Sequence, residues 1–121
     1  MGTKTYKDVI AWQKSFVLAT SIYAITQNFP KHELYGITSQ IRRSVVSIGS
    51  NIVEGYARKG LKESLAFYRI AYASLEESKF QLQLAYELNY LNYNDYKRIR
   101  SESDECGRVL NGWIAGHSKI H

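Results

Sequence analysis

The sequence contains 121 residues, of which 45% are hydrophobic and 22% charged, and its formal net charge is +5. This length suits a single domain spanning residues 1–121 and leaves no room for a second one. A lone cysteine excludes an internal disulfide, and no apolar run approaches the roughly 20 residues that cross a membrane. We therefore expect a cytoplasmic protein without membrane contact. The positive charge favours anionic partners, although such charge is also common in proteins that bind none.

Four segments show helical periodicity, and the single proline permits long uninterrupted helices. The helices are predicted over about residues 8–28, 33–54, 61–88 and 93–115. Asp8 is expected to cap the first helix and Pro30 to end it, whereas Gly55 is expected to close the second helix in a left-handed conformation. Asn92 is expected to cap the last helix, and the tail through His121 to fray. Four long helices with short loops predict an all-α, antiparallel up-down-up-down four-helix bundle.

The second predicted helix has one face suited to a core and one polar face. Apolar residues recur every three or four positions on the first face: Ile37, Ile41, Val45, Ile48 and Ile52. The polar row consists mostly of short side chains: Gln40, Arg43, Ser47, Ser50 and Glu54. Solvated faces normally carry Lys and Glu, so we interpret this row as facing another polar surface. Because the helix dipole disfavours a carboxylate at a C-terminus, we expect Glu54 to have a cationic partner, such as Arg43 of a neighbouring subunit.

The third predicted helix is apolar on nearly every side. Its main row, within residues 61–86, keeps a near-heptad rhythm that only Lys79 interrupts. A second row of mostly small residues contains Phe67, Ala71, Ser74, Ser78 and Ala85, and a third contains Ile70, Ala73, Phe80 and Leu84. A bundle of this size cannot cover every side of such a helix, so we expect the chain to self-associate. Ala71 and Ser74 are candidate contacts between subunits.

Most of the net charge is concentrated in one segment. Its candidate nucleic-acid-binding residues are Arg42, Arg43, Arg58, Lys59, Lys62 and Arg69. Only Glu54 and Glu63 oppose these six cations, so the segment holds +4 of the net +5. Arginine can donate two hydrogen bonds to one phosphate, and Tyr56 and Tyr68 are available to stack on unpaired bases. The alternative is that these cations pair with nearby glutamates or are simply solvated.

No residue pattern indicates an enzyme. The chain lacks the Glu-x-x-His pairs of di-iron bundles, a glycine-rich phosphate loop and a Gly-x-Ser-x-Gly turn. We therefore expect no catalytic residue, no metal, no cofactor and no small-molecule substrate. Cys106 belongs to the apolar stripe of the last helix and is interpreted as an inert, buried thiol. The opposite side of that helix, within residues 97–108, is interpreted as an ordinary solvated face.

Several blocks of the sequence match one protein family in order. They are residues 6–12, 29–30, 40–43, 47–48, 51–52 and 54–55, together with Glu33, Tyr35, Gly36, Ala71, Ser74, Leu75 and Glu77. In these blocks the chain resembles the bacterial four-helix-bundle proteins encoded within intervening sequences of 23S ribosomal RNA genes, which are related to accessory proteins of diversity-generating retroelements. It departs from the family pattern at Val53, Ala73 and Ser78, which all lie on packing surfaces.

The resemblance implies a homopentameric barrel of bundles that binds nucleic acid and has no established enzymatic activity. It makes seven positions characteristic, as structural or interface candidates: Gln40, Ser47, Asn51, Glu54, Gly55, Ala71 and Ser74. The first function hypothesis is a small oligomeric protein that binds RNA, DNA or an RNA–DNA intermediate electrostatically, with weak sequence selectivity. The alternative is a structural scaffold that recruits a protein partner through its polar rims and binds no nucleic acid.

Overall fold

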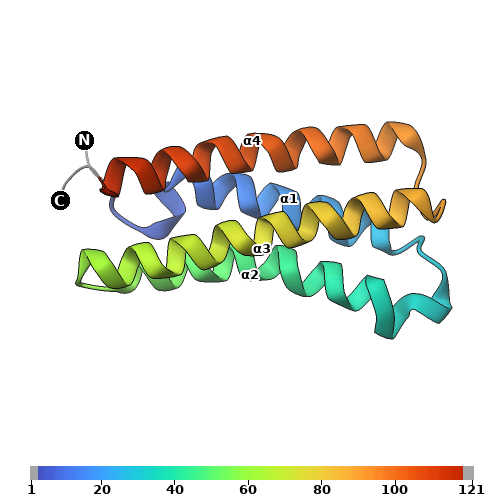
Figure 1. Cartoon of the computed structure of the whole chain (residues 1–121), viewed down its shortest axis with the longest axis horizontal. Helices are drawn as coiled ribbons and strands as arrows, with labels where there is room; N and C mark the ends of the chain where they lie inside the picture. The colour runs from blue at the N-terminus through green and yellow to red at the C-terminus, as the bar shows by residue number, and fades with distance from the viewer. Residues whose placement is uncertain (1–2, 119–121) are drawn as a thin grey trace.

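The computed structural model describes residues 3–118, and within them it contains four long α-helices and no strand (Figure 1). The helices are α1 (Ile10–Thr26), α2 (Ser39–Ala57), α3 (Leu61–Glu87) and α4 (Tyr93–Ser118). Short 3-10 helices occupy Tyr6–Asp8 and Lys31–Glu33, and a π turn, Leu34–Thr38, leads into α2. The predicted all-α class and the four predicted helices are confirmed.

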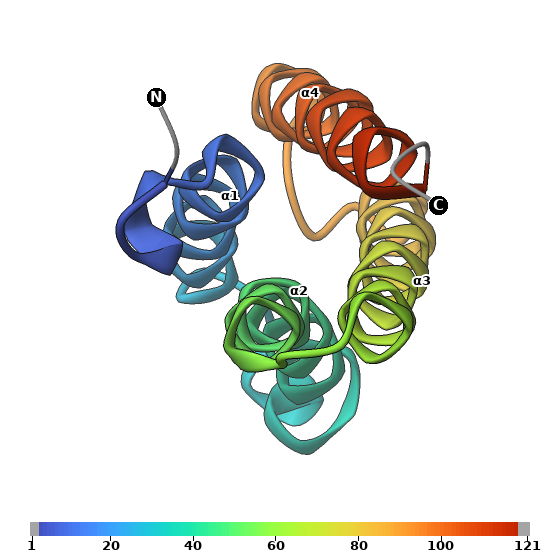
Figure 2. The same cartoon turned by 90° about the vertical axis from the view of Figure 1, so that its left-hand side faces the viewer.

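Consecutive helices run antiparallel, so α1 and α3 point one way and α2 and α4 the other (Figure 1). Viewed along the bundle, the helices follow one another around the core in chain order, and α4 returns to α1 (Figure 2). The contact between α2 and α3 is the most extensive. The tight α2–α3 turn lies at the same end as Tyr6–Asp8, and the other two connections lie at the opposite end. This is the up-down-up-down arrangement.

The core is built on the apolar stripe of α2. Ile41, Val45, Ile48 and Ile52 are each at most 1% exposed, as their periodicity predicted. The other helices supply facing residues: Leu18, Ile22, Tyr68, Leu75, Leu82, Ile99, Cys106 and Leu110. Fully burying one aliphatic side chain contributes about 1.5–3 kcal/mol, so this stripe and its partners are the main favourable term in folding.

The first helix starts later than predicted, because Asp8 caps a different element. Its carboxylate accepts the backbone N–H groups of Lys4 and Thr5 at 2.9 and 3.1 Å, which closes a capping box around the 3-10 helix Tyr6–Asp8. These two donors lower the pKa of the Asp8 carboxyl. Val9 is extended, and α1 begins after it without a side-chain cap.

Gly55 does not end the second helix, which corrects the prediction of a left-handed terminus. It is buried inside α2, which continues to Ala57, and no glycine of residues 3–118 has a positive φ. A Cβ at Gly55 would lie 2.5 Å from Cε1 of Tyr68 and 3.0 Å from the carbonyl oxygen of Ser64. Glycine is therefore required here because α3 approaches the backbone of α2 closely.

The left-handed terminus occurs instead at the end of α3, where Asn89 has φ 64°. Tyr90 N–H donates to the Ala85 carbonyl at 2.9 Å, and Asn89 N–H donates to the Tyr86 carbonyl at 2.9 Å, which is a Schellman motif. Asn92 then accepts the Asp95 N–H at 2.7 Å, as predicted for a cap. Helix α4 continues to Ser118, past its predicted end near residue 115 and into the tail predicted to fray, and residues 119–121 lie outside the described part.

A hydrogen bond joins the two connections at the far end of the bundle. The Tyr90 hydroxyl donates to Glu33 at 2.7 Å, and the other carboxylate oxygen of Glu33 accepts the Ile37 N–H at 3.3 Å. Gly36 has non-helical angles, φ −107° and ψ −120°, and a Cβ there would collide with the Glu33 carboxylate. This irregular turn is why the regular α-helix begins at Ser39 and not near Glu33 as predicted.

Replacing Gly55 with alanine tests the close approach of α3. The added methyl group must displace the Tyr68 ring, so we expect G55A to lose about 1–3 kcal/mol of unfolding free energy. The matched control is G112A in α4, where a Cβ meets nothing within 4 Å. That variant should gain up to about 1 kcal/mol from helix propensity. Urea unfolding compares the two, and equal effects would show that Gly55 is not a packing position.

Glu33 should make stability depend on acid pH. The Tyr90 hydroxyl and the Ile37 N–H lower the pKa of Glu33 below its ordinary value of 4.5, so its contribution is present above that value and is lost as the pH falls through the lowered pKa. E33Q should be less stable than wild type at pH 7, and the difference should shrink as the pH falls below 4.5. Y90F, which keeps the ring against Phe29, should show a smaller change. Urea midpoints that differ by the same amount at every pH would contradict this role.

Candidate nucleic-acid interface

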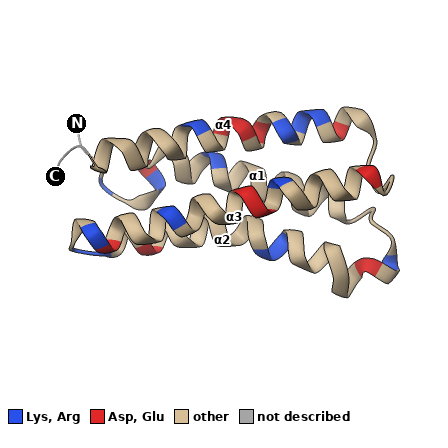
Figure 3. Cartoon of the chain, in the orientation of Figure 1, with Lys and Arg blue, Asp and Glu red and all other residues tan. Residues whose placement is uncertain are grey.

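The predicted basic residues fall into two groups. Arg42 and Arg43 lie in the first half of α2, and Arg58 directly follows its last residue, so about 22 Å of helix separates the groups. The tight α2–α3 turn keeps Arg58, Lys59 and Lys62 within five residues, and we call these three the basic turn. Figure 3 shows basic segments at this end of the bundle. The structure therefore brings half of the predicted site together.

Arg42 has a structural role. Its Nε donates to Thr26 Oγ1 at 2.8 Å, and its guanidinium lies over the Tyr23 ring with Cζ 4.9 Å from the centroid. Both partners belong to α1, and the arginine side chain is half-buried. Arg42 therefore joins α1 to α2, and its Nε donor is already occupied by Thr26.

Arg58 is partly committed as well. It pairs with Glu54 at 3.1 Å, and its Cζ lies 4.7 Å from the centroid of the Phe67 ring. Glu54 thus has the cationic partner that its position required, but this partner is in the same chain. Arg43, which was expected to fill that role from a neighbouring subunit, is exposed and forms no ion pair within residues 3–118.

Lys59, Lys62 and Arg69 are the predicted cations most available to an anion. All three are exposed, and none forms an ion pair within the described residues. Arg69 lies two turns along α3 from Lys62, about 10 Å away along the helix axis. An anion at the basic turn can therefore contact two lysines without displacing an acidic partner.

Two further cations lie at this end, and sequence reasoning missed them. Thr3 Oγ1 and the Tyr56 hydroxyl are 2.9 Å apart, which holds the N-terminal segment against the end of α2. Lys4 and Lys7 therefore lie at the same end of the bundle as the basic turn, with Asp8 as a nearby acidic residue. Only a contact between distant parts of the chain reveals this, so no local signal in the sequence indicates it.

The polar row of α2 contacts a polar row of α3 through Ser47, whereas its other four members are exposed. Ser47 Oγ lies 2.8 Å from Ser74 Oγ, and Asn51 donates to the Ser47 carbonyl at 2.8 Å. Further along, Ser78 donates to Ser44 at 2.8 Å. Five residues along this contact form what we call the polar seam: Ser44 and Ser47 of α2, and Ser74, Ser78 and Gln81 of α3. Polar atoms buried in the seam bond to one another, as burial of polar groups requires.

The polar seam changes the interpretation of the interface candidates. Ala71 is fully buried and Ser74 is 8% exposed, and both pack within one chain. They were expected to contact a second subunit, and the contact between α2 and α3 takes that place. Of the remaining candidates, Gln40 and Glu54 are exposed, Ser47 is a half-buried member of the seam, and Asn51 is half-buried and bonded to Ser47.

One apolar groove lies between α1 and α2. It has a volume of about 280 Å³, and its main lining residues are Tyr6, Trp12, Phe16, Val46, Gly49 and Val53; we call it the α1–α2 groove. Trp12 stacks on Phe16 with centroids 5.2 Å apart, yet Phe16 remains 56% exposed. A neighbouring hollow between α1 and α2 is lined by Tyr23, Tyr35, Arg42 and Arg43, so cations lie beside this face.

A second apolar surface lies on α3. It consists of Ile70, Ala73, Phe80, Leu84 and Leu88, the third predicted row continued by one residue, and we call it the α3 face. Phe80 is 67% exposed, and Glu77 and Glu87 are exposed beside it. The other two rows of α3 are covered by α2 and α4. Only the third row is therefore left as the exposed apolar surface that was predicted for this helix.

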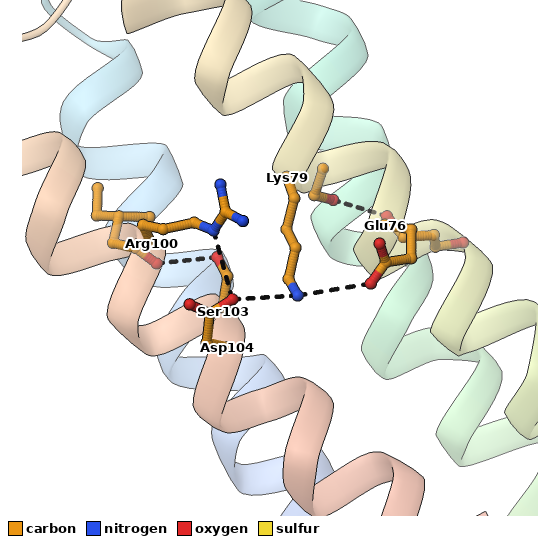
Figure 4. Close-up of polar contacts among 8 residues, drawn as sticks. Glu76, Lys79, Arg100, Ser103 and Asp104 are labelled. Carbon is orange, nitrogen blue, oxygen red and sulfur yellow. Dashed lines mark hydrogen bonds and ion pairs between the residues drawn. The ribbon is translucent and has the colours of Figure 1, made fainter.

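Lys79, which interrupts the heptad rhythm, lies between α3 and α4. Its ammonium is 3.2 Å from Asp104 and 3.5 Å from Glu76, and Asp104 also accepts from Arg100 Nε at 3.3 Å (Figure 4). Burial would raise the pKa of Asp104, but Lys79 and Arg100 together outweigh it and lower that pKa. The positive charges of Lys79 and Arg100 therefore balance the negative charges of Glu76 and Asp104 between α3 and α4.

Cys106 lies in the core, as its stripe predicted. It is fully buried, and burial raises the pKa of its thiol to about 11. Within residues 3–118, no three His, Cys, Asp or Glu side chains gather closely enough to hold a metal ion. No helix of the described part has the length and apolar character needed to cross a membrane.

These features define a compact antiparallel four-helix bundle with two exposed apolar surfaces and a basic end. The chain belongs to the 23S rRNA-intervening sequence protein family, whose sequence model matches residues 7–112. A crystal structure from Bacteroides thetaiotaomicron, described as a protein with unknown function from the S23 ribosomal protein family, has the same fold, with a TM-score of 0.82 and 25% identity. The similarity covers 90% of this chain and 98% of that one. No curated protein matches the sequence.

Proposed function

We propose that this protein is an oligomeric helical bundle that binds RNA, DNA or an RNA–DNA intermediate through electrostatic, weakly sequence-selective contacts. The basic turn is the observation that carries the proposal. Lys59 and Lys62 are exposed there without acidic partners in the described residues, and Arg69, Lys4 and Lys7 extend the charge. Phosphate groups bind such cations by releasing counterions, which requires no pocket and little sequence preference.

The distribution of ion pairs supports this location. Several cations on the remaining surface are already paired: Lys14 with Glu105, and Arg98 with Asp95 and Glu102. Such pairs cancel most of the field that a phosphate would meet. The net +5 therefore acts mainly through cations that lack a partner, and the basic turn holds two of them within four residues of the chain.

Self-association is the second part of the proposal, and the α1–α2 groove and the α3 face support it. We infer that the α3 face of one copy packs into the α1–α2 groove of the next. The groove has Arg42 and Arg43 beside it, whereas the α3 face has Glu77 and Glu87, so charge favours this pairing. A contact between two different surfaces is heterologous and closes into a ring when the rotation fits.

A ring would multiply the effect of the basic turn. Five subunits, the number that the family resemblance implies, would repeat Lys59 and Lys62 around one axis. Each copy would bind phosphate weakly, but linked copies bind one polyanion with a high effective concentration. Assembly and nucleic-acid binding are therefore proposed as parts of one function.

A scaffold that recruits a protein is the second candidate. The α1–α2 groove favours it, because stacked Trp12 and exposed Phe16 are the kind of aromatic anchors that protein interfaces use. In that case the groove would hold a partner protein and not a second copy. The state of association of the purified protein separates the two occupants.

Charge removal at the basic turn tests nucleic-acid binding. Each phosphate that a lysine no longer neutralises should lower the slope of log affinity against log salt by about 0.7–0.9, so the double variant K59Q/K62Q should flatten it by up to about 1.4–1.8. The control K14Q/K31Q removes the same number of charges elsewhere. Lys14 pairs with Glu105 between α1 and α4, and Lys31 lies at the opposite end of the bundle. Fluorescence anisotropy with labelled RNA and DNA measures both. Equal effects in the two variants would mean that binding is diffuse, and no binding by wild type at low salt would reject the function.

Matched variants test the heterologous contact. F80E damages the α3 face and F16E damages the α1–α2 groove, so each alone should be a monomer of 13.9 kDa by light scattering. When the two are mixed, the intact α3 face of F16E should fill the intact groove of F80E and give a dimer. V17E, which places the same charge on a 51% exposed residue outside the groove lining, should assemble like wild type. A monomeric wild type, or a dimer formed by either variant alone, would contradict the arrangement.

A further inference from the structure

A second groove runs along α4 on its side toward α3. Its volume is about 300 Å³, and its lining residues are Tyr93, Tyr96, Lys97, Arg100, Ser101, Asp104 and Arg108. These residues recur at steps of three or four along α4, so they form one stripe about 22 Å long from Tyr93 to Arg108. We call it the α4 groove. Its surface was interpreted from the sequence as an ordinary solvated face.

The charges of α4 are sorted between its two sides. Asp95 and Glu102 pair with Arg98 at 3.5 Å, and Glu105 pairs with Lys14 of α1 at 3.1 Å. None of these four residues of α4 lines the α4 groove. Of these acidic residues, Glu105 is held toward α1, and three cations line the groove with a single acid, Asp104.

Asp104 offsets only one of those three cations, Arg100. Its carboxylate oxygen accepts from Arg100 and also meets Lys79, which reaches it from α3 at 3.2 Å (Figure 4). Because Lys79 also pairs with Glu76 at 3.5 Å, the charges of Lys79 and Arg100 balance those of Glu76 and Asp104 within one cluster. Lys97 and Arg108 are exposed and form no ion pair within residues 3–118, so both are available to an anion.

A tyrosine cluster forms one end of the α4 groove. Tyr86 of α3 stacks on Tyr96 with centroids 4.5 Å apart and an interplanar angle of 16°. Tyr93 lies 6.2 Å from Tyr86 and is 57% exposed. The Tyr96 hydroxyl accepts from Arg100 at 3.4 Å, which ties the aromatic end of the groove to its cationic part. The Tyr93 ring thus packs against Tyr86, and its exposed part is available to stack with a flat ligand.

We propose that the α4 groove binds single-stranded nucleic acid, with an unpaired base stacked on Tyr93 and backbone phosphates on Lys97 and Arg108. This inference rests on the proposed nucleic-acid-binding function and gives it a second site with a defined ligand class. Aromatic rings beside a cationic track are the arrangement by which proteins hold single strands, because every base offers a π face and every linkage a phosphate. In a duplex the bases are stacked on one another, so Tyr93 could contribute little.

The two kinds of residue should leave different signatures. Stacking is not ionic, so Y93L should weaken binding of a single-stranded 12-nucleotide oligo(U) roughly five- to hundred-fold while leaving the salt slope unchanged. Y93F keeps the ring and should bind like wild type. K97Q/R108Q should lower the salt slope by about 1.4, because each phosphate of a single strand that is no longer neutralised accounts for about 0.7. Circular dichroism and light scattering confirm that fold and assembly are preserved.

The same titrations use a duplex of equal length and uridine monophosphate as further probes. Support requires that Y93L weaken oligo(U) binding while duplex binding changes little. The inference is overturned if oligo(U) binds and Y93L has no effect, or if Y93L weakens duplex binding equally, because Tyr93 then stacks on no base. It is also overturned if uridine monophosphate binds as tightly as oligo(U), since the groove would then hold a free nucleotide. Failure of wild type to bind any probe at low salt rejects the proposed function as well, whereas loss of binding in K59Q/K62Q alone leaves that function standing and rejects this site.

Discussion

The close contact between α2 and α3 is the constraint on which the rest of the structure depends. Near one end, Gly55 lets the Tyr68 ring lie against the helix backbone, and in the middle Ser47 and Ser74 share a hydrogen bond. Short side chains allow the approach, and mutual hydrogen bonding removes the cost of burying their hydroxyl groups. Because these bonds are directional, the pair fixes the register of the two helices, and α1 and α4 then pack on a defined surface.

That contact also decides which surfaces are left for partners. The rows of α3 that face α2 and α4 are buried inside the bundle, so the apolar residues of α3 that remain exposed are those of the α3 face around Phe80. On the other side of α2, the small residue Gly49 leaves room for the groove beside Trp12. The two apolar surfaces thus belong to different helices, which is the geometry that heterologous assembly needs. The basic turn and the α4 groove lie outside both surfaces, so assembly need not cover them.

The sequence predicted whatever depends on periodicity and missed what depends on contact between distant residues. The isoleucine stripe of α2 repeats with the helix, and four helices with one topology follow from such repeats. Gly55 was misassigned because a glycine at a helix terminus and a glycine under an aromatic ring look alike in one dimension. The sequence shows how many basic residues the segment contains but not which of them are free to bind a ligand. Arg42 donates to Thr26 and Arg58 pairs with Glu54, and both contacts depend on the folded structure. The separation of charges between the two sides of α4 was missed, although the spacing of the charged residues can be read from the sequence. The pairing of Glu105 with Lys14 depends on how α1 packs against α4, which the sequence does not show.

The buried thiol has a practical consequence. Cys106 is the single cysteine of the chain, it is fully enclosed, and its pKa of about 11 keeps it protonated at neutral pH. The thiolate is the form that attacks electrophiles, so maleimides and mild oxidants should leave the native protein unmodified while it is folded. A cysteine introduced on the surface would then be the sole reactive sulfur in the molecule. Spectroscopic labels can be attached at chosen positions without first removing a native residue, and slow labelling of Cys106 itself reports how often the core opens.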